Sequence, residues 1–476
     1  MGRITRREFI KAGTGGALGL AGCATIQGLR RDTAHGKRPN LLFVMGDQWR
    51  RQAMGFMHED PVLTPCIDRF VERALAFTNA VSCSPVCAPY RASMLTGRYP
   101  VSHKVYWNGI RLPAEEITIA EVLKDAEYDT GYIGKWHLDG GTPSHFIPPG
   151  PRRQGFDFWY AHEVFHQHFK LEYYADSPEP IKGDGWQPDH ETDDAINYMR
   201  THGKDKPFVL FVSWSPPHTN HGGPRFDPNG ERYQYHAPER FEALYRGKNL
   251  PRRPNVPYSE KEKALLGTYA LPGYFGAITS LDENFGRLLK CLDEQGIAED
   301  TIVVLTSDHG DVMGSQNGFT KGVPYEESIG IPFLIRYPGH VKTRREDLLF
   351  NTVDVMPSLL GLMGIPIPTV VEGTDYSAAM CGKKVKEPDS MLLEHFRDNP
   401  ETGWRALRTR QYTFVVRRTD EGRRYYVLFD NLNDPYQMKP RTASEGEDPL
   451  MNKLWDELKR WLEKTNDPWV RSEKKR

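Results

Sequence analysis

Four side chains of types that bind divalent cations stand in two adjacent pairs, each directly after a strongly apolar run of the chain. The first pair is Asp47 and Gln48. The second pair is Asp308 and His309. Carboxylate and amide oxygens are the ligands that hard cations such as calcium prefer, and an imidazole makes the set slightly softer. The two pairs therefore predict a site for one divalent ion, provided that the fold brings the two runs together.

A histidine that can move a proton follows a third apolar run. His218 closes the polar segment Ser213–His218, where it could exchange a proton with a leaving group. Taken alone, a histidine in a proline-rich loop is usually a surface residue, and an aspartate after an apolar run is more often a helix cap than a ligand. The joint occurrence of these residues at three similar places favours a catalytic site.

The apolar runs that precede these residues are typical of strands buried on both faces of a sheet. They cover Asn40–Met45, Pro207–Val212 and Thr301–Thr306. Between the last two, apolar residues from Ile278 to Leu292 fall on one face at helical spacing. This alternation predicts an α/β domain around a largely parallel sheet, in which ligands bind at the carboxyl ends of the strands.

The pattern of the chain changes near residue 375, so we assign residues 36–375 to the α/β catalytic domain. Beyond it, Trp404–Arg418 and Arg423–Phe429 predict the two strands of a hairpin, and Leu450–Lys464 predicts a closing amphipathic helix. We therefore expect residues 376–476 to form a smaller, antiparallel α+β subdomain that packs on the first domain.

The composition excludes several broad classes of protein. The 476 residues include 62 Lys and Arg against 63 Asp and Glu, a formal net charge of −1, which excludes binding to nucleic acid through bulk positive charge. A hydrophobic content of 38%, with 43 glycines and 36 prolines, fits a loop-rich globular protein rather than a disordered chain. Six cysteines are too few to form a disulfide scaffold at this length. An anionic substrate must therefore be held by a local cluster of cations.

Residues 1–35 are set apart from the fold because they are typical of an export signal with a linker. Thr5–Lys11 resembles a signal for the twin-arginine export machinery, and the apolar run Ala12–Ala21 is too short to span a bilayer. The run ends beside Cys23, in a segment that resembles a lipoprotein processing site. We expect an exported, periplasmic protein, either anchored to the membrane by a lipid on Cys23 or released by ordinary cleavage of the signal.

The most specific pattern of the sequence begins at Cys87. The segment Cys87–Arg98 resembles the signature of the type I sulfatases, C-x-P-x-R followed by x-x-x-L-T-G-R, in register throughout. Cys83 cannot be the signature cysteine, because its frame places Cys87 where the arginine must stand. The resemblance implies that a formylglycine-generating enzyme oxidises Cys87 to formylglycine (3-oxoalanine), an aldehyde whose hydrate serves as the nucleophile.

Further segments resemble the same family, in family order, from about Asn40 to Asp434. The resemblance implies an alkaline-phosphatase-like α/β sandwich, with a large and mostly parallel central sheet flanked by helices. The matching segments are Gly134–His137, Gly155–Asp157, Pro217–His218, Ser307–Gly310, Lys321, Tyr325–Glu326, Leu428–Asp430 and Asn433–Pro435.

The resemblance also implies a role for each matching residue, and elementary chemistry is consistent with these roles. A sulfate ester is an anion, so attack on its sulfur needs cations to offset negative charge, and a divalent ion can lower the pKa of the attacking hydroxyl. His137 would orient or deprotonate the nucleophile, and His218 would protonate the leaving alcohol. The implied catalytic residues are Cys87, Arg91, Lys135, His137, His218 and Lys321. The implied metal ligands are Asp47, Gln48, Cys87, Asp308 and His309.

Two departures from the family pattern concern the metal site. Where many relatives have Asp-Asp, this chain has Asp47 and Gln48. Where many have Asp-Asn, it has Asp308 and His309. One carboxylate fewer lowers the negative charge of the site, so we expect one calcium ion, with manganese as its rival because of the imidazole. The same pairing occurs in relatives that hydrolyse phosphonate monoesters or phosphodiesters, and such a hydrolase is the first alternative function.

The expected function is removal of sulfate from a sulfated oligosaccharide or polysaccharide. Export favours such a substrate over a small aryl ester, as does the proline- and histidine-rich stretch from about 140 to 260, which predicts long pocket-building loops. In that stretch His162, His166 and His168 fit contact with substrate better than a second metal site. The second alternative is an inactive relative that only binds sulfated glycan, which the intact set of catalytic matches argues against.

Overall fold

The structure is a computed structural model, and it describes residues 38–141, 144–203, 205–219, 235–257, 270–397, 399–418 and 422–473. The predicted export signal at 1–35, with Cys23, lies outside these residues. No helix in the described part of the chain is both long and apolar enough to cross a membrane. The cysteines within the described ranges all carry free thiols.

Strand β1 (Asn40–Asp47) is covered on both faces of the central sheet. All of its residues are buried. Leu41 and Phe43 pack into the hydrophobic cluster on one face of the sheet, while Leu42 and Val44 pack into the cluster on the other. Because side chains alternate between the faces of a strand, an uninterrupted apolar run is stable only where both faces are covered. The predicted doubly buried strand is confirmed.

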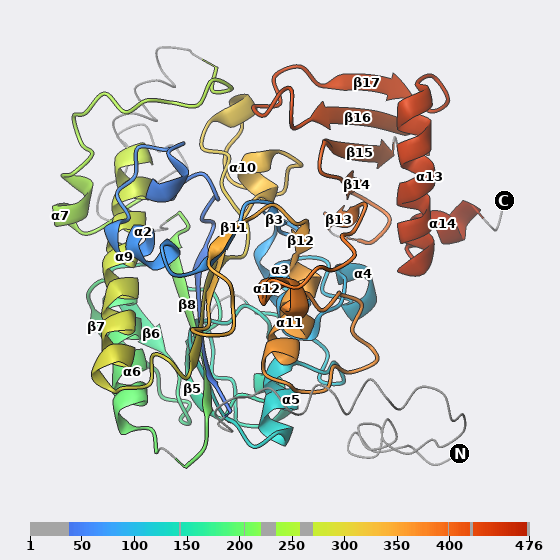
Figure 1. Ribbon diagram of the computed structural model, residues 1–476. Helices are drawn as coiled ribbons and strands as arrows, with labels where there is room; N and C mark the ends of the chain where they lie inside the picture. The colour runs from blue at the N-terminus through green and yellow to red at the C-terminus, as the bar shows by residue number, and fades with distance from the viewer. Residues whose placement is uncertain are drawn as a thin grey trace, which may run out of the picture.

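The central sheet has eight strands and is mostly parallel, as predicted (Figure 1). β1 pairs in parallel with β8 and β9, and β4 pairs in parallel with β5 and β8. β10 runs antiparallel to both of its neighbours, β2 and β9. In spatial order the strands are β11 (Arg344–Glu346), β2 (Leu75–Phe77), β10 (Phe333–Arg336), β9 (Thr301–Ser307), β1 (Asn40–Asp47), β8 (Phe208–Pro217), β4 (Asp129–Lys135) and β5 (Phe158–His162).

Helices lie on both faces of this sheet (Figure 1). On one face α9 packs against α6, α2 and strand β8, and on the other α3 packs against α5 and α11. The predicted apolar face of α9 is confirmed, since Ile278, Leu281 and Phe285 are fully buried. The bounds are α2 (Pro65–Val71), α3 (Cys87–Thr96), α5 (Ile119–Asp125), α6 (Gln187–Thr201), α9 (Leu271–Glu294) and α11 (Val355–Leu362).

A five-stranded antiparallel sheet with helix α13 (Pro449–Lys464) packed on it confirms the predicted C-terminal architecture (Figure 1). The single strand predicted over Trp404–Arg418 is wrong. It is two strands, because Thr409 turns the chain by bonding to Tyr412 through both its backbone and its side chain. The strands are β13 (Met391–His395), β14 (Trp404–Arg408), β15 (Tyr412–Arg418), β16 (Arg424–Asp430) and β17 (Arg441–Ser444).

The stretch from 140 to 260 contains more regular structure than the loops that we predicted. Its described residues include α6, whose buried positions recur at helical spacing but are occupied partly by polar side chains such as Gln187, Glu191 and Thr192. The remaining elements are β3 (Ala80–Val81), α4 (Pro100–His103), β6 (Lys170–Tyr173), β7 (Ile181–Asp184), α7 (Glu239–Glu242), α10 (Glu326–Ile329), β12 (Phe350–Asn351), α12 (Ser377–Met380) and α14 (Pro468–Glu473), with short 3-10 helices η1 (Gly55–Met57), η2 (Pro151–Arg153), η4 (Ser315–Asn317) and η5 (Thr352–Asp354).

The C-terminal sheet touches the segment that leads to Cys87. The backbone nitrogen of Glu394 in β13 donates to the carbonyl oxygen of Cys83 at 2.7 Å. Met380 of α12 packs in the core of the large sheet, and the antiparallel sheet begins at Met391. The domain boundary near residue 375 stays a prediction, and the two sheets together position the start of α3.

Candidate active site

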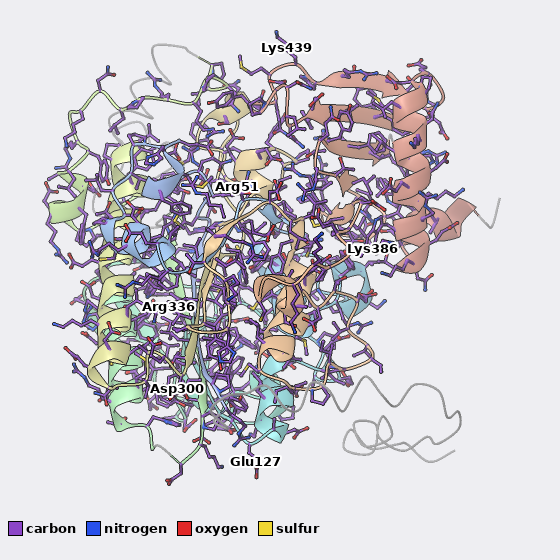
Figure 2. The ribbon with its side chains drawn as sticks, in the orientation of Figure 1. Arg51, Glu127, Asp300, Arg336, Lys386 and Lys439 are labelled. Atoms are coloured by element: carbon purple, nitrogen blue, oxygen red, sulfur yellow. The ribbon has the colours of Figure 1, made fainter. Side chains whose placement is uncertain are left out.

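The predicted site residues lie where the parallel strands of the central sheet end. Asp47 is the last residue of β1, Lys135 is the last residue of β4, and Asp308 directly follows β9. Figure 2 shows the direction of the strands: Asp300, just before β9, lies near the lower end of the molecule, and Arg51, just after β1, lies in the upper part. Strands far apart in sequence thus deliver their polar side chains to one edge, as the α/β pattern predicts.

Helix α3 presents Cys87 and Arg91 to this edge. Cys87 is its first residue and Arg91 follows one turn later, so both side chains lie on the same side of the helix. All residues of α3 are buried, so packing on every side fixes its position. Gly97 ends the helix with a φ of +65°, and a Cβ there would lie only 2.8 Å from the side chain of Val371. The signature glycine is therefore needed both for its left-handed conformation and for its lack of a side chain.

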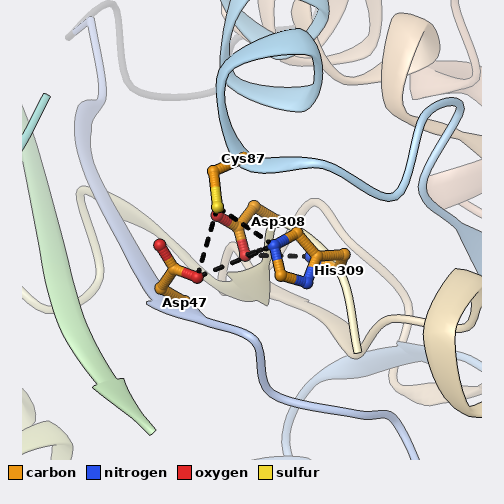
Figure 3. A group of neighbouring side chains, drawn as sticks. All are labelled: Asp47, Cys87, Asp308 and His309. Carbon is orange, nitrogen blue, oxygen red and sulfur yellow. Dashed lines mark hydrogen bonds and ion pairs between the residues drawn. The ribbon is translucent and has the colours of Figure 1, made fainter. Parts of the chain in front are cut away.

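Four groups able to bind a metal ion converge at Cys87 (Figure 3). One atom from each of Asp47, Cys87, Asp308 and His309 lies within 4.8 Å of all the others, and all four side chains are buried. Nδ1 of His309 lies 3.0 Å from the carbonyl oxygen of Gly310, so a neutral imidazole donates there and keeps a lone pair on Nε2. Nε2 is the atom beside Cys87, 3.2 Å from its Sγ. Two carboxylates and an imidazole so arranged fit a divalent cation.

Two buried cations hold the carboxylates of this group. Nζ of Lys135 lies 2.5 Å from Asp47. One terminal nitrogen of Arg91 lies 3.3 Å from Asp47 and 3.2 Å from Asp308. Its other terminal nitrogen donates to the carbonyl oxygen of Lys135 and to Oγ of Ser213, both at 2.7 Å. Arg91 is thus committed to contacts within the protein and fixes the two carboxylates.

Lys321 and Gln48 complete the group on its other side. Nζ of Lys321 lies 3.3 Å from Sγ of Cys87 and donates to Oε1 of Gln48 at 2.8 Å. The amide nitrogen of Gln48 in turn donates to Asp311 at 2.5 Å, and Asp311 also accepts a hydrogen bond from Tyr235. The structure therefore places Gln48 beside the ligand group with its oxygen on Lys321, and its role as a metal ligand stays a prediction.

The charges around Cys87 lower the pKa values of Asp47 and of Cys87 itself. Burial opposes ionisation of Asp47, but the charges of Lys135, Lys321 and Arg91 outweigh it, and the pKa of Asp47 lies well below the ordinary value. Burial and Asp47 oppose ionisation of the Cys87 thiol, but Lys135 and Lys321 outweigh them and lower its pKa. An electropositive field of this kind stabilises negative charge at the position of Cys87.

The two predicted catalytic histidines are buried beside the same cations. His137 is 6% exposed and His218 is 9% exposed. Burial is the main reason why the pKa of both imidazoles lies well below the ordinary value. The charge of Lys135 lowers the pKa of His137 further, and the charge of Lys321 does the same for His218. Nδ1 of His218 lies 3.0 Å from the carbonyl oxygen of Thr219, so Nε2 is the ring nitrogen without a proton in the neutral form. Both histidines are therefore neutral in the absence of a bound anion.

In the described part of the chain, the histidines at 162, 166 and 168 contact different neighbours. His166 stacks on His218 with ring centroids 4.1 Å apart, and His168 lies 2.9 Å from the carbonyl oxygen of His218. His162 instead faces Glu191, 3.6 Å away. Within the described ranges the only cluster of three or more metal-binding side chains is the one at Cys87. The stacking of His166 on His218 had no signal in the sequence pattern.

The structure brings together every residue that we predicted for the site, and it adds residues that the sequence did not single out. Ser213 and Tyr235 support Arg91 and Asp311 through hydroxyl groups. Ser213 comes at the end of a predicted strand, so its position was a usable signal. Tyr235 is distant in sequence from the site residues, and only the fold places it there.

The comparison with protein families decides the identity of the chain. The family model described as sulfatase matches residues 39–365, which is more than half of the chain. The chain belongs to the sulfatase family. A second model, for the C-terminal region of N-sulphoglucosamine sulphohydrolase, matches residues 314–464 of this sulfatase. The protein is a sulfuric ester hydrolase with the alkaline-phosphatase-like fold, as the signature at Cys87 predicted.

Several relatives resemble this sulfatase over most of their length. An ulvan-active sulfatase of Formosa agariphila is 39% identical over 445 residues, which cover 90% of this chain and 82% of the relative. An endo-4-O-sulfatase of Bacteroides thetaiotaomicron is 30% identical over 513 aligned positions, covering 94% of this chain and 96% of the relative. Among solved structures, a sulfatase from work on glycosaminoglycan metabolism in Bacteroides thetaiotaomicron superposes with a TM-score of 0.83 at 29% identity, covering 92% of this chain and 98% of that one.

Proposed function

We propose that this sulfatase removes sulfate from a sulfated carbohydrate, using formylglycine made from Cys87 and one divalent metal ion. The observation that carries the proposal is the position of Cys87. Its Sγ lies 3.6 Å from Asp47, 3.2 Å from His309 and 3.3 Å from Lys321. A nucleophile at this point meets an anionic ester between a cation site and a lysine, where its negative charge is offset.

A divalent ion and a formylglycine at position 87 both fit the residues present at the site. When bound, the divalent ion would polarise the ester and lower the pKa of an attacking hydroxyl. Oxidation of Cys87 by a formylglycine-generating enzyme would supply that hydroxyl, as the hydrate of an aldehyde. Calcium is the proposed ion because most donor atoms are oxygens, and manganese is its rival because His309 adds an imidazole. We assign the ion to Asp47, Gln48, Asp308, His309 and the oxidised side chain at position 87.

The cationic side chains of the site have two roles: one holds the metal ligands in place, and two bind the substrate. The terminal nitrogens of Arg91 are already bonded to Asp47, Asp308 and other protein atoms. We therefore assign Arg91 to holding the metal ligands in place. Lys135 and Lys321 then bind and orient the sulfate oxygens. Point charges on flexible stems suit an anion whose charge shifts among its oxygens as a bond breaks.

His218 is assigned to the leaving oxygen and His137 to the nucleophile. A bound sulfate ester would raise the pKa of His218 again, since an anion nearby favours the imidazolium form. Nε2 would then carry the proton that passes to the leaving alcohol. The face of His218 rests on His166, at 4.1 Å between ring centroids, which holds the ring in one orientation. His137, buried beside Lys135, keeps a neutral nitrogen available to accept a proton from the nucleophile.

The substrate class is proposed from the relatives and the sequence together. An ulvan-active sulfatase and an endo-4-O-sulfatase resemble this chain at 39% and 30% identity over nearly its whole length. The names of these relatives, ulvan-active sulfatase and endo-4-O-sulfatase, support a carbohydrate substrate.

We also propose that the protein is exported and acts in the periplasm, with a lipid anchor on Cys23. The support is the pattern Thr5–Lys11 and the segment that ends at Cys23, both outside the described residues. Fractionation of cells that express the full chain tests this. Wild-type protein should be found with the membrane, and Cys23→Ser should be soluble in the periplasm, whereas a cytoplasmic wild type would contradict export.

The direct test of the function is sulfate release from a panel of sulfated oligosaccharides and polysaccharides. The protein would be produced together with a formylglycine-generating enzyme, and the Cys87 peptide would be checked by mass. We expect one class of glycan to release sulfate with wild type and none with Cys87→Ala. Turnover of a phosphodiester or phosphonate monoester, without sulfate release, would favour the alternative hydrolase. Binding of glycan without any turnover would favour an inactive relative.

A further inference from the structure

A cluster of cations outside the site described above surrounds Asp139, two residues beyond His137. The Asp139 side chain is fully buried. Nε of Arg111 lies 3.0 Å from one carboxylate oxygen, and Nε of Arg152 lies 2.9 Å from the same oxygen. A terminal nitrogen of Arg152 and Nε2 of His145 contact the other oxygen. One buried carboxylate thus orients two guanidinium groups and an imidazole.

The two arginines keep unused hydrogen-bond donors at the surface. The side chain of Arg111 is 56% exposed and that of Arg152 is 34% exposed. In the described part of the chain, neither terminal nitrogen of Arg111 has a hydrogen-bond partner, and Nη1 of Arg152 has none either. A guanidinium fixed at one edge and open at the other is suited to bind a planar or tetrahedral anion.

The charge around Asp139 is not balanced within the cluster. A second acid in the described part of the cluster is Glu163, whose Oε1 accepts a hydrogen bond from the backbone nitrogen of Asp139 at 2.6 Å. Burial raises the pKa of Glu163 to about 7, so near neutral pH it carries only part of a negative charge. The two guanidinium groups of Arg111 and Arg152 therefore face one fully ionised carboxylate, and an added anion would meet a net positive charge.

The cluster is attached to the strand that carries the catalytic residues. Asp139 follows β4, which ends at Lys135, and the Cα atoms of residues 137 and 139 lie at most about 7 Å apart because two residues span no more. Arg111 is tied to the same segment by an antiparallel bridge to Asp139. The cluster therefore lies close along the chain to the catalytic residues.

We propose that Arg111 and Arg152 form a subsite for a second anionic group, a carboxylate or a sulfate, on a sugar that neighbours the one being desulfated. The inference rests on the proposed function and deepens it, because it predicts that the substrate is a polyanionic glycan. A purely structural role would explain Arg152, which is anchored through two of its nitrogens. It explains Arg111 poorly, because a side chain this exposed gains little from an ion pair.

The test compares selectivity among three substrates that differ only in the second anion. They are an oligosaccharide with one sulfate and a neighbouring uronate, the same compound with the carboxylate reduced to an alcohol, and its analogue with a second sulfate in place of the carboxylate. For wild type we expect kcat/KM to be about tenfold higher for a doubly anionic substrate than for the reduced one, equivalent to one charge-assisted hydrogen bond. Arg111→Ala and Arg152→Ala should lower that ratio toward one. The anion that gives the larger ratio identifies the ligand.

The matched control is Arg240→Ala, which removes an arginine that is 57% exposed and is also paired with a carboxylate, that of Glu283. It should leave the ratio as in wild type, while Arg111→Lys should keep part of it. A wild-type ratio near one, or a ratio that Arg111→Ala and Arg152→Ala do not change, would overturn the inference. A wild type that hydrolyses an aryl sulfate but none of the oligosaccharides would instead overturn the carbohydrate substrate, so the two failures are distinct.

Discussion

Two buried arginines, one beside the central sheet and one in the C-terminal sheet, show how the same residue type serves different ends. Arg91 and Arg405 both have side chains no more than 1% exposed, and both contact aspartates that are fully buried. Arg91 lies at the carboxyl edge of the large sheet, among the metal-binding group. Arg405 lies in β14 of the antiparallel sheet, where its Nε is 2.6 Å from Asp467.

The surroundings of Arg405 are closed and balanced. Its guanidinium is stacked between the rings of Phe396 and Trp469, at 4.1 and 4.6 Å from their centroids. Its terminal nitrogens donate to backbone carbonyl oxygens, among them that of Pro400. The cation is paired with one carboxylate and shielded by aromatic rings, so it has nothing further to bind. It therefore acts as a structural pair.

The surroundings of Arg91 are unbalanced by comparison. Two more cations, Lys135 and Lys321, belong to the same centre, and its carboxylates are Asp47 and Asp308. An excess of cations is costly to bury unless something compensates it. The difference indicates that the sulfatase centre is built to receive an anion, whereas the charges of Arg405 and Asp467 already balance each other.

The largest effect should come from breaking the balanced pair. Arg405→Met leaves Asp467 buried without a partner, and loss of one member of such a pair costs about 3–5 kcal/mol of unfolding free energy. We expect reduced stability in chemical denaturation with kcat unchanged in the molecules that remain folded. The double variant Arg405→Met/Asp467→Leu should recover much of the loss. A fall in kcat without a fall in stability would mean that Arg405 serves the active site.

Removal of a cation from the unbalanced centre should have the opposite signature. Lys135→Met should lower kcat/KM by about 10²–10³-fold, the usual cost of one electrostatic contact to the reacting group. Thermal unfolding should change little by comparison. Lys124→Met, which removes an exposed lysine paired with Asp157, is the matched control and should keep full activity. Full activity in Lys135→Met would show that the cations around Arg91 do not serve the reaction. It would therefore contradict the contrast with the structural ion pair of Arg405.

His218→Gln tests which reactions need the proton. The loss of kcat should be roughly 10²-fold for a carbohydrate or alkyl sulfate, the lower range for a general acid. It should be much smaller for a nitrophenyl sulfate, whose leaving group needs no proton. Brønsted plots for wild type and His218→Gln over a series of aryl sulfates would measure how strongly kcat depends on the pKa of the leaving group. Equal losses for good and poor leaving groups would assign His218 to binding.

The smallest effect sharpens the contrast between paired and unpaired acids. Glu191 is a buried carboxyl that contacts the hydroxyl of Tyr173 and the neutral imidazole of His162, and burial raises its pKa to about 8. The folded protein therefore keeps a proton that the unfolded chain loses near pH 4.5, so this contribution to stability is full below about pH 4.5 and is lost as the pH rises through 8. Glu191→Gln should reduce the slope of stability against pH between 6 and 8 by up to about 1.4 kcal/mol per pH unit. Stability would be measured by urea unfolding at several pH values. The same slope in wild type and in Glu191→Gln would show that burial does not raise the pKa of Glu191.

Much of the fold and most of the site could be predicted from sequence because both depend on local patterns. The apolar runs that became β1, β8 and β9 are explicit in the chain, and the signature from Cys87 to Arg98 is unusually specific. Carboxyl ends of parallel strands meet at one edge of a sheet, so the order of residues along the chain suffices to group the polar side chains that follow them. Their catalytic roles stay predictions until they are measured.

What could not be predicted depends on tertiary contacts or on polar burial. Helix α6 was missed because Gln187, Glu191 and Thr192 occupy its buried face, and an apolar periodicity search does not register them. The stack of His166 on His218 and the arginines around Asp139 join residues whose spacing carries no code. Such contacts are set by how the long segments between strands fold back on the sheet.

The central claim is that Cys87, once oxidised, is the nucleophile of a centre built to bind a sulfate ester. The most direct measurement is the fraction of Cys87 converted to formylglycine, by peptide mass, against sulfate release across preparations made with different amounts of the generating enzyme. The account predicts that activity is proportional to conversion and falls by on the order of 10⁴-fold or more in Cys87→Ala. Full activity in unconverted protein, or in Cys87→Ala, would contradict it.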